Sequence, residues 1–227
     1  MALHDRWVQE RKHEHYYKLA KKLKYRSRAS FKLMQIDDRF GIFRDGDSVV
    51  DLGASPGGWL QVAKGRVGEK GKVVGVDLRY IRPLEGVTTI IGDITEDSTM
   101  RKLIETFGGK ADVVLSDMAP NIGGNYSTDH ARSVDLCMYA VAVCDRILKK
   151  EGKLVVKVFM GDMLGPLLDE LESRFKSVKV HSPDASRETS SEVYIISKGF
   201  LSSRNVKLKD ISEEEKKPEF RAKGGNI

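Results

Sequence analysis

The chain has 227 residues, of which 40% are hydrophobic and 32% charged, and its formal net charge is +6 at pH 7. These values fit one large folded domain with short extensions and argue against wholesale disorder. No apolar run approaches the roughly 20 residues that cross a bilayer, and the start of the chain lacks the apolar stretch of a signal peptide. We therefore expect a cytoplasmic protein without a membrane partner.

Positive charge is concentrated at the N-terminus. Residues 1–32 hold ten lysines and arginines against three acids, a local charge of +7, which leaves −1 for the rest of the chain. Aromatic residues lie among them, and this mixture is typical of surfaces that bind RNA or single-stranded nucleic acid. The alternative is a solvated helix whose Tyr17, Ala20 and Leu23 pack on the domain while its lysines face water. The expected RNA contacts are Lys21, Lys22, Lys24, Arg26 and Arg28.

Three regions follow from this distribution. We expect a basic arm over residues 1–24, one folded domain over residues 25–200, and a C-terminal extension over residues 201–227. The extension is balanced in charge and poor in apolar residues, so we expect it to be flexible. Cys137 and Cys144 lie too far apart along one helix for a disulfide, and we expect two buried thiols.

The folded domain begins with a predicted helix over Ser27–Phe40, which Gly41 ends. After it, short apolar runs alternate with amphipathic ones, of which Ser133–Leu148 and Leu164–Phe175 are the clearest helices. This alternation predicts an α/β fold with a mostly parallel sheet that helices cover on both faces. The expected strands are Ser48–Leu52, Lys72–Val76, Thr88–Ile91, Asp112–Ser116, Leu154–Phe159, Ser177–His181 and Val193–Ser197.

Aspartates mark the ends of the first four strands: Asp51, Asp77, Asp93 and Asp117. A single acid at such a position is as often a helix N-cap as a ligand contact. Ligands of parallel sheets bind outside the carboxyl ends of the strands. Four acids at that edge, together with a glycine-rich turn, therefore favour a ligand site.

The turn after the first strand reads Gly53-Ala54-Ser55-Pro56-Gly57-Gly58, and its glycines let the backbone approach a ligand closely. It lacks the Gly-x-Gly-x-x-Gly spacing of dinucleotide sites and a Walker lysine, so an adenosine ligand without a pyrophosphate fits better than NAD. Asp77 is placed for ribose hydroxyls and Asp93 for an adenine amine. Acids near Gly53 and Asp117 suit a sulfonium or amino group. These features favour S-adenosylmethionine, with NAD as the alternative.

Five separated motifs occur in order along the chain: Tyr25–Leu33, Asp51–Trp59, Ser116–Asn121, Val156–Phe159 and Ser191–Tyr194. Together they resemble the FtsJ family of RNA ribose 2′-O-methyltransferases, most closely the branch that acts on uridine in large-subunit (23S-type) ribosomal RNA. The resemblance implies a Rossmann-like S-adenosylmethionine-dependent methyltransferase fold with seven strands, of which the last is antiparallel. It also implies ribosomal RNA as the partner, either free or within the large ribosomal subunit.

The resemblance implies site residues as well. The family's Lys-Asp-Lys-Glu catalytic tetrad maps to Lys32, Asp117, Lys157 and Glu192. Ser191 stands where arginine is frequent in the family, and Ser55 where alanine is common. The family's cofactor contacts map to Gly57, Gly58, Trp59, Asp77, Asp93 and Asp117, to which we add Asp51, Gly53, Ser55 and Pro56 from the same turn.

The methyl-transfer reaction explains why lysines and carboxylates are needed at these positions. Methyl transfer to a ribose hydroxyl requires that the hydroxyl be aligned with the activated methyl and lose its proton as the bond forms. Lys157 lies inside an apolar strand, where lysine is unusual unless it snorkels from an edge. We expect Lys157 to be the base, held by Asp117 and Glu192, with Lys32 positioning the substrate. The alternative is a charged Lys157 that only orients the hydroxyl.

Three other functions compete with this one. An amine methyltransferase tends to carry Asn/Asp-Pro-Pro-aromatic after the fourth strand, whereas this chain reads Asp117-Met118-Ala119-Pro120. Methylation of transfer RNA by the same mechanism and a non-catalytic RNA-binding role stay as alternatives. No cluster of His, Cys and carboxylate residues has the spacing of metal ligands, so no metal is expected.

Overall fold

The computed structural model describes residues 14–186 and 191–201. The first half of the expected basic arm and nearly all of the expected C-terminal extension lie outside the described residues. Within the described ranges, no helix is long and apolar enough to cross a membrane.

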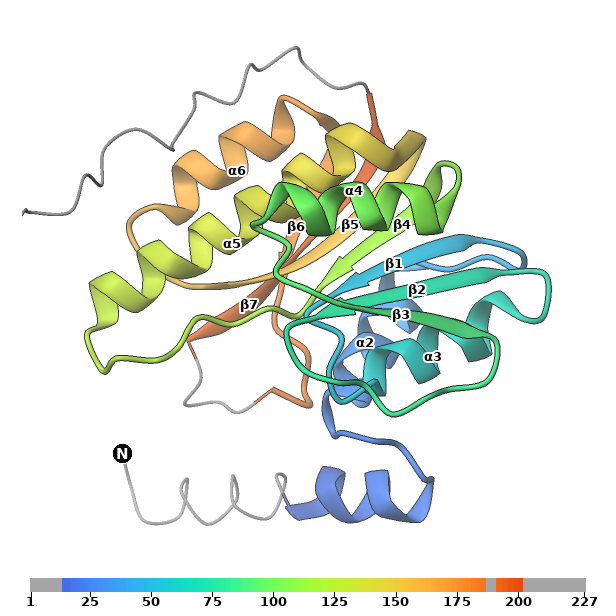
Figure 1. The fold of residues 1–227 in the computed structure, drawn as a ribbon. Coiled ribbons are helices and arrows are strands. Elements are labelled where there is room, and N and C mark those ends of the chain that lie inside the picture. Colours follow the sequence, from blue (N-terminus) through green and yellow to red (C-terminus); the bar gives the residue numbers. More distant parts are fainter. Residues whose placement is uncertain (1–13, 187–190, 202–227) are drawn as a thin grey trace, which may run out of the picture.

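A seven-stranded sheet forms the centre of the domain (Figure 1). The strand order is β3-β2-β1-β4-β5-β7-β6, and only β7 runs antiparallel to its neighbours. The expected mostly parallel sheet with an antiparallel last strand is therefore confirmed. The strands are β1 (Ser48–Leu52), β2 (Lys72–Asp77), β3 (Val87–Ile91), β4 (Ala111–Ser116), β5 (Leu148–Phe159), β6 (Phe175–His181) and β7 (Glu192–Phe200).

Helices cover both faces of the sheet, as expected (Figure 1). One face carries α2 (Ala29–Phe40) and α3 (Gly58–Val67), and the other carries α4 (Asp97–Phe107), α5 (Tyr126–Ile147) and α6 (Leu164–Glu172). Because both faces are covered, the central strands are apolar on both sides, and each face has its own buried cluster.

Two boundaries differ from the expected ones by more than three residues. Helix α5 begins at Tyr126, seven residues before the expected start, because Asn125 caps it by accepting a hydrogen bond from Thr128 N at 3.1 Å. Its first turns are built mostly from polar residues, some of them buried, so the apolar periodicity does not reveal them. Strand β5 begins at Leu148 rather than Leu154, since Leu148 already pairs with Ala111 across an irregularity in the ladder.

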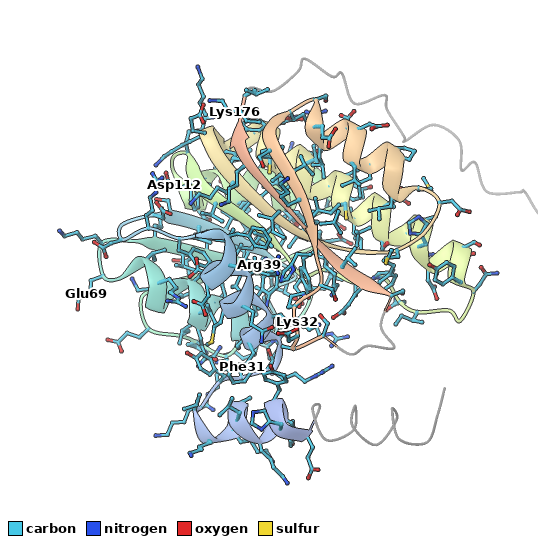
Figure 2. The ribbon with its side chains drawn as sticks, turned by 180° about the vertical axis from the view of Figure 1, so that it is seen from behind. Phe31, Lys32, Arg39, Glu69, Asp112 and Lys176 are labelled. Atoms are coloured by element: carbon cyan, nitrogen blue, oxygen red, sulfur yellow. The ribbon has the colours of Figure 1, made fainter. Side chains whose placement is uncertain are left out.

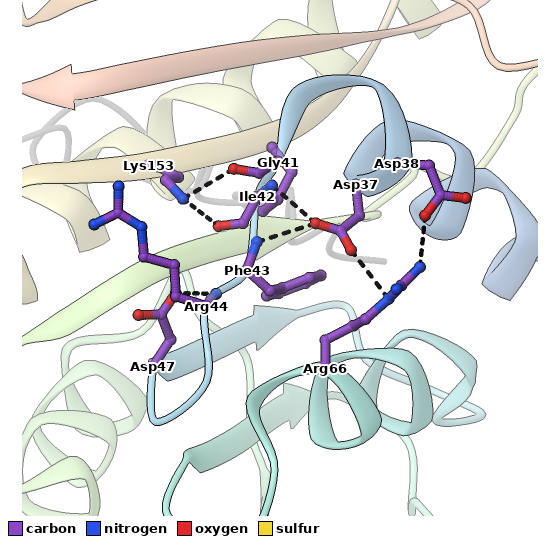
Figure 3. A network of polar contacts seen from close by, with 9 residues as sticks. All are labelled: Asp37, Asp38, Gly41, Ile42, Phe43, Arg44, Asp47, Arg66 and Lys153. Carbon is purple, nitrogen blue, oxygen red and sulfur yellow. Dashed lines mark hydrogen bonds and ion pairs between the residues drawn. The ribbon is translucent and has the colours of Figure 1, made fainter.

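The C-terminal end of α2 is fixed to the sheet by a polar network (Figure 3). The Asp37 carboxylate accepts hydrogen bonds from the amides of Ile42 and Phe43 at 2.8 and 3.0 Å and pairs with Arg66 of α3 at 3.0 Å. Lys153 of β5 donates to the carbonyls of Gly41 and Ile42 at 3.0 and 2.5 Å. This network fixes the position of α2 relative to β5. That position matters because α2 carries Lys32 and β5 carries Lys157, the two lysines expected to be catalytic.

The described part of the basic arm is helical over residues 14–22 and packs beside the start of α2. Ala20 is buried with Phe31, whose place at the start of α2 is labelled in Figure 2. Tyr17 and Leu23 are about half exposed. Of the three residues considered for packing on the domain, only Ala20 is therefore buried.

Candidate active site

The four aspartates expected at strand ends lie along the carboxyl edge of the parallel strands. Asp51 lies within β1, Asp77 ends β2, Asp93 follows β3 by two residues, and Asp117 directly follows β4. None of them is a helix N-cap, because the residues that precede α3, α4 and α5 are Gly57, Glu96 and Asn125. The capping alternative is thus excluded for these four acids.

The glycine turn between β1 and α3 is closely packed by the segment before α2. Gly57 has a φ of 105°, which side chains rarely tolerate, and a Cβ there would lie 2.7 Å from the Arg26 guanidinium. A Cβ at Gly58 would lie 2.3 Å from Ser27 Oγ. No side chain caps the first turn of α3, so its amides offer donors to an anionic group of a ligand.

Arg26, an expected RNA contact, is engaged within the protein. Its guanidinium donates to the carbonyls of Pro56, Arg82 and Pro83 at 3.3, 2.5 and 2.7 Å. Its backbone amide donates to Gln61 of α3 at 2.8 Å. Arg26 therefore ties the glycine turn to the loop that follows β2, and we leave it out of the proposed RNA surface.

Asp51 is fully buried, and neither of its carboxylate oxygens has a hydrogen-bond partner among the described residues. Burial raises the pKa of Asp51 well above its usual value, and the nearby charges of Asp117 and Asp77 add to the increase. A buried carboxylate without a partner costs free energy. A ligand that brings a hydrogen-bond donor or a positive charge to this position would recover that cost.

Asp77 and Asp93 are organised by backbone amides. The Asp77 carboxylate accepts from Ser55 N and Arg79 N, both at 2.8 Å, so it joins the glycine turn to the loop after β2. Asp93 accepts from Thr95 N at 2.9 Å and from Thr95 Oγ1 at 2.7 Å. Both side chains are partly exposed and keep acceptor capacity for ribose hydroxyls or an exocyclic amine.

The acids, the glycine turn and the uncapped helix start fit S-adenosylmethionine, which carries hydroxyls, an amine, a carboxylate and a sulfonium. Trp59, expected at the cofactor, is itself buried. Its indole Nε1 donates to Ala29 O at 2.8 Å, and its ring lies 5.8 Å from that of Tyr194. Its side chain thus joins α2, α3 and β7.

Two ion pairs bring the four tetrad residues together. Lys32 of α2 forms an ion pair with Glu192 at the start of β7, and only 7% and 14% of the two side chains are exposed. Lys157 of β5 lies 2.9 Å from Asp117 Oδ1 and also donates to the Asp117 carbonyl at 2.7 Å. The position of Lys32 at the start of α2 is labelled in Figure 2. Each buried cation therefore has a carboxylate partner, which reduces the cost of burying it.

Tyr194 connects the two pairs. Its hydroxyl donates to Asp117 Oδ1 at 2.9 Å, and the Lys32 ammonium lies 5.7 Å from the centre of its ring. In the β5–β7 ladder, Tyr194 is the register partner of Lys157. Burial and the charge of Asp117 raise the pKa of Tyr194 well above its usual value, so the hydroxyl stays a donor.

Glu192 is held in its charged form. Burial alone raises the pKa of Glu192, but the Lys32 ammonium, with Lys157 behind it, outweighs burial and the net pKa is lowered. The carboxylate therefore persists to lower pH than that of an ordinary glutamate.

At the end of β5, side chains of α5 form the backbone hydrogen bonds that β4 forms earlier along the strand. The β4–β5 ladder ends at Ser116 and Val156, one residue before Lys157. Beyond that point, Cys137 Sγ donates to Lys157 O at 3.2 Å, Ser133 Oγ accepts from Phe159 N at 3.1 Å, and His130 Nδ1 donates to Phe159 O at 2.9 Å. These bonds satisfy a strand that would otherwise have a free edge, and they fix the backbone that carries Lys157.

The remaining expected RNA contacts lie before α2. Lys21, Lys22 and Lys24 are exposed, and Lys21 lies 4.7 Å from the centre of the Tyr17 ring. Arg28 is partly buried and has interactions within the protein. The three lysines, but not the two arginines, are available to a polyanion.

Sequence reasoning did not assign a role to Tyr194 or to the α5 residues Ser133 and Cys137. Tyr194 lies two residues after Glu192, so strand alternation puts both on one face. Ser133 and Cys137 are four residues apart on the buried face of α5, together with His130. Such small polar residues on an apolar helix face are the signal that could have identified them.

Known proteins resemble this chain in sequence and in fold. Residues 25–200 match the family model described as FtsJ-like methyltransferase. The chain is 56% identical over 189 residues to ribosomal RNA large subunit methyltransferase E of Methanosarcina mazei, covering 83% of this chain and 70% of that protein. It is 48% identical over 200 residues to the protein of that name from Methanocaldococcus jannaschii, covering 86% and 82%. A crystal structure described as a ribosomal RNA methyltransferase from Plasmodium falciparum has a TM-score of 0.72 and 29% identity, covering 79% of this chain and all of that one.

Proposed function

Because this chain belongs to the FtsJ-like methyltransferase family, which uses S-adenosylmethionine, we propose that it 2′-O-methylates a ribose of large-subunit ribosomal RNA. The target nucleotide is a uridine, and the enzyme acts in the cytoplasm. One observation carries the proposal: the Lys32–Glu192 and Lys157–Asp117 ion pairs converge on Tyr194 at the carboxyl edge of the sheet. The same edge carries the unpartnered Asp51 carboxylate.

In the cofactor half of the site, Asp51, Asp77 and Asp93 would hold the amino, ribose and adenine groups, with the Gly53–Gly58 turn against the ligand. Bound S-adenosylmethionine supplies a methyl group that is already activated by the sulfonium. The residues of the protein therefore have to orient the ribose hydroxyl, exclude water and take up one proton.

Lys157 has the geometry of a base. Its amine donates a hydrogen bond to the Asp117 backbone carbonyl at 2.7 Å and forms an ion pair with Asp117 Oδ1 at 2.9 Å. In its neutral form the amine has a lone pair, which can accept the 2′-hydroxyl proton as the hydroxyl oxygen attacks the methyl carbon. Asp117 then stabilises the ammonium that forms, and the Lys32–Glu192 pair positions the ribose.

A methyl-transfer assay tests the proposal. Labelled S-adenosylmethionine is incubated with undermethylated large ribosomal subunits, naked ribosomal RNA or transfer RNA, and the RNA is digested to nucleosides for mass spectrometry. We expect 2′-O-methyluridine from the large-subunit substrate and none with Lys157→Ala. Label on transfer RNA alone would overturn the target but keep the reaction, and label on a base amine would overturn the reaction. Cofactor binding without transfer to any of the three RNAs would favour a non-catalytic RNA-binding role.

The pH dependence of single-turnover transfer separates the two roles of Lys157. If Lys157 is the base, the rate rises with pH until the amine is neutral. A rate that does not rise, together with substantial activity in Lys157→Arg, would indicate a charged residue that only orients the hydroxyl, because arginine stays protonated.

A further inference from the structure

Beside the tetrad, the structure exposes apolar side chains on two neighbouring loops. Ile122 lies on the loop between β4 and α5 and is 74% exposed, and Tyr126 at the start of α5 is 58% exposed. Met160 and Met163 lie on the loop after β5 and are 49% and 43% exposed. We call these four residues the apolar rim. Neither the cofactor half nor the tetrad uses them.

The first turns of α5 hold the two loops together. The Tyr126 hydroxyl donates to Met160 O at 2.5 Å, and Met163 N donates to His130 Nε2 at 3.0 Å. The Asp129 carboxylate accepts from Gly123 N and Gly124 N at 2.9 and 3.1 Å. The rim is therefore fixed by hydrogen bonds, and the Tyr126 ring is oriented through its hydroxyl while much of its surface faces solvent.

The rim continues directly from the catalytic residues. Met160 lies three residues after Lys157, and its amide donates to Ser191 O at 2.7 Å, next to Glu192. A ribose held between Lys157 and the Lys32–Glu192 pair would thus have its neighbouring nucleotides within the same stretch of surface. Only single-stranded RNA reaches such a site with its bases free to contact protein.

The chemistry of the rim suits nucleobases next to a phosphate backbone. Exposed aromatic rings and methionines offer flat or adaptable apolar contacts to a base. Arg132, six residues after Tyr126 on α5, is exposed, has no ion-pair partner among residues 14–186 and 191–201, and lies beside Gly123. It supplies a positive charge for a phosphate at the edge of the rim.

We propose that the apolar rim binds the bases that flank the methylated ribose in single-stranded RNA, with Tyr126 as the stacking residue and Arg132 as a phosphate contact. The inference rests on the proposed function, since it assumes that RNA enters the tetrad. It assigns to the rim a part of substrate binding that is separate from cofactor binding and from methyl transfer.

Tyr126→Ala and Tyr126→Phe test the proposal with a transcript of large-subunit ribosomal RNA and, separately, with S-adenosylmethionine. Loss of one stacked base weakens binding by roughly 5- to 150-fold, so we expect the KM and Kd for RNA to rise by that factor in Tyr126→Ala. The Kd for S-adenosylmethionine stays unchanged. Tyr126→Phe keeps the ring and loses only the bond to Met160, so it retains most of the RNA affinity. Val180→Ala, an exposed apolar residue on β6, is the matched control that leaves RNA binding unchanged.

Each other result contradicts the proposal. Unchanged RNA affinity in Tyr126→Ala would exclude stacking. Equal losses in the alanine and phenylalanine variants would assign the effect to the hydroxyl bond, and a parallel loss of S-adenosylmethionine binding would show a structural role. Ile122→Ser provides the same test if Tyr126→Ala does not fold. Failure of the proposed function is distinguishable, because the unaltered enzyme would then methylate none of the RNAs offered.

An abasic nucleotide sharpens the test once the modified position is mapped. If a flanking base stacks on Tyr126, removing that base weakens binding to the unaltered enzyme but has no further effect on Tyr126→Ala. Additive losses from the two changes would place the base elsewhere and overturn the proposal.

Discussion

The two halves of the site handle buried charge in opposite ways. In the catalytic half, Lys32 and Lys157 each have a carboxylate partner, so the charges balance within the protein. In the cofactor half, Asp51 is fully buried with no partner among the described residues. We expect this difference to decide what each half binds: a neutral hydroxyl in the balanced half, and a ligand that brings positive charge in the acidic half.

The two halves should also respond differently to mutation, because a paired charge and an unpaired charge contribute differently to the stability of the fold. Removing one member of a buried ion pair leaves a buried charge, so it destabilises the fold. Removing an unpartnered carboxylate should increase the stability of the folded protein and weaken only ligand binding. The following predictions test this contrast, beginning with the largest expected effect.

Lys157→Ala has the largest expected effect on activity. General base catalysis contributes roughly 10²–10⁴-fold, so single-turnover methyl transfer should fall by about that factor while the Kd for S-adenosylmethionine changes little. Lys150→Ala is the control, because Lys150 lies on the same strand at an exposed position away from the site. If the Lys150 variant lost as much methyl transfer, the loss would reflect strand β5 and not the base.

Glu192→Gln should destabilise the protein, because it leaves the Lys32 ammonium buried without its carboxylate. Breaking a buried pair costs about 3 kcal/mol, which urea unfolding would measure. The lowered pKa of Glu192 means that its contribution is fully present above the pKa of the unfolded chain and is lost as pH falls through the folded-state pKa. The variant and the unaltered protein should thus converge in stability at acidic pH, and a constant difference would contradict the pairing.

Asp51→Asn should stabilise the protein, in contrast to Glu192→Gln. Because burial raises the pKa of Asp51, the folded protein keeps that proton where the unfolded chain has lost it, so stability falls as pH rises through this window. The amide variant lacks this loss and should be more stable without ligand at neutral pH. Its affinity for S-adenosylmethionine should fall about 10- to 150-fold, since a charged hydrogen bond contributes about 1.5–3 kcal/mol.

Thermal melting with and without S-adenosylmethionine measures both effects of Asp51→Asn. Asp169→Asn, at an exposed position of α6, is the matched control. A destabilised Asp51→Asn variant would mean that the carboxylate already has a partner, and the contrast between the two halves would fail.

Replacing the exposed lysines before α2 (Lys21, Lys22 and Lys24) should affect neither the cofactor half nor the catalytic half of the site. Replacing them with glutamine should weaken RNA binding several-fold and reduce the salt dependence of log Kd by about 0.7 for each phosphate that is no longer neutralised by a lysine. Cofactor affinity and single-turnover methyl transfer at saturating RNA should stay unchanged. Equal weakening in a triple variant of other exposed lysines would show that only net charge matters. The test set is Lys21, Lys22 and Lys24, and the control set is Lys70, Lys102 and Lys179.

Arg26 shows where sequence reasoning was insufficient. It lies in a basic segment, so its charge alone suggested an RNA contact, but in the fold its guanidinium donates to three carbonyls around the glycine turn. Those carbonyls come from residues 56, 82 and 83 and lie beside Arg26 only after β1 and β2 pair. The start of α5 was missed for a related reason, because a polar first turn is defined by its cap and not by apolar periodicity.

The sequence by itself determined the layered α/β fold, the antiparallel last strand at the level of a family resemblance, and the edge at which aspartates and glycines gather. These features follow from local periodicity and from the rule that parallel strands end together. Tertiary structure alone decided the pairing of charges: Lys32 with Glu192 across 160 residues, Lys157 with Asp117 across 40, and Asp51 with no described partner. Charge pairing depends on distances of a few ångströms between elements that are remote in the chain, and no local pattern encodes those distances.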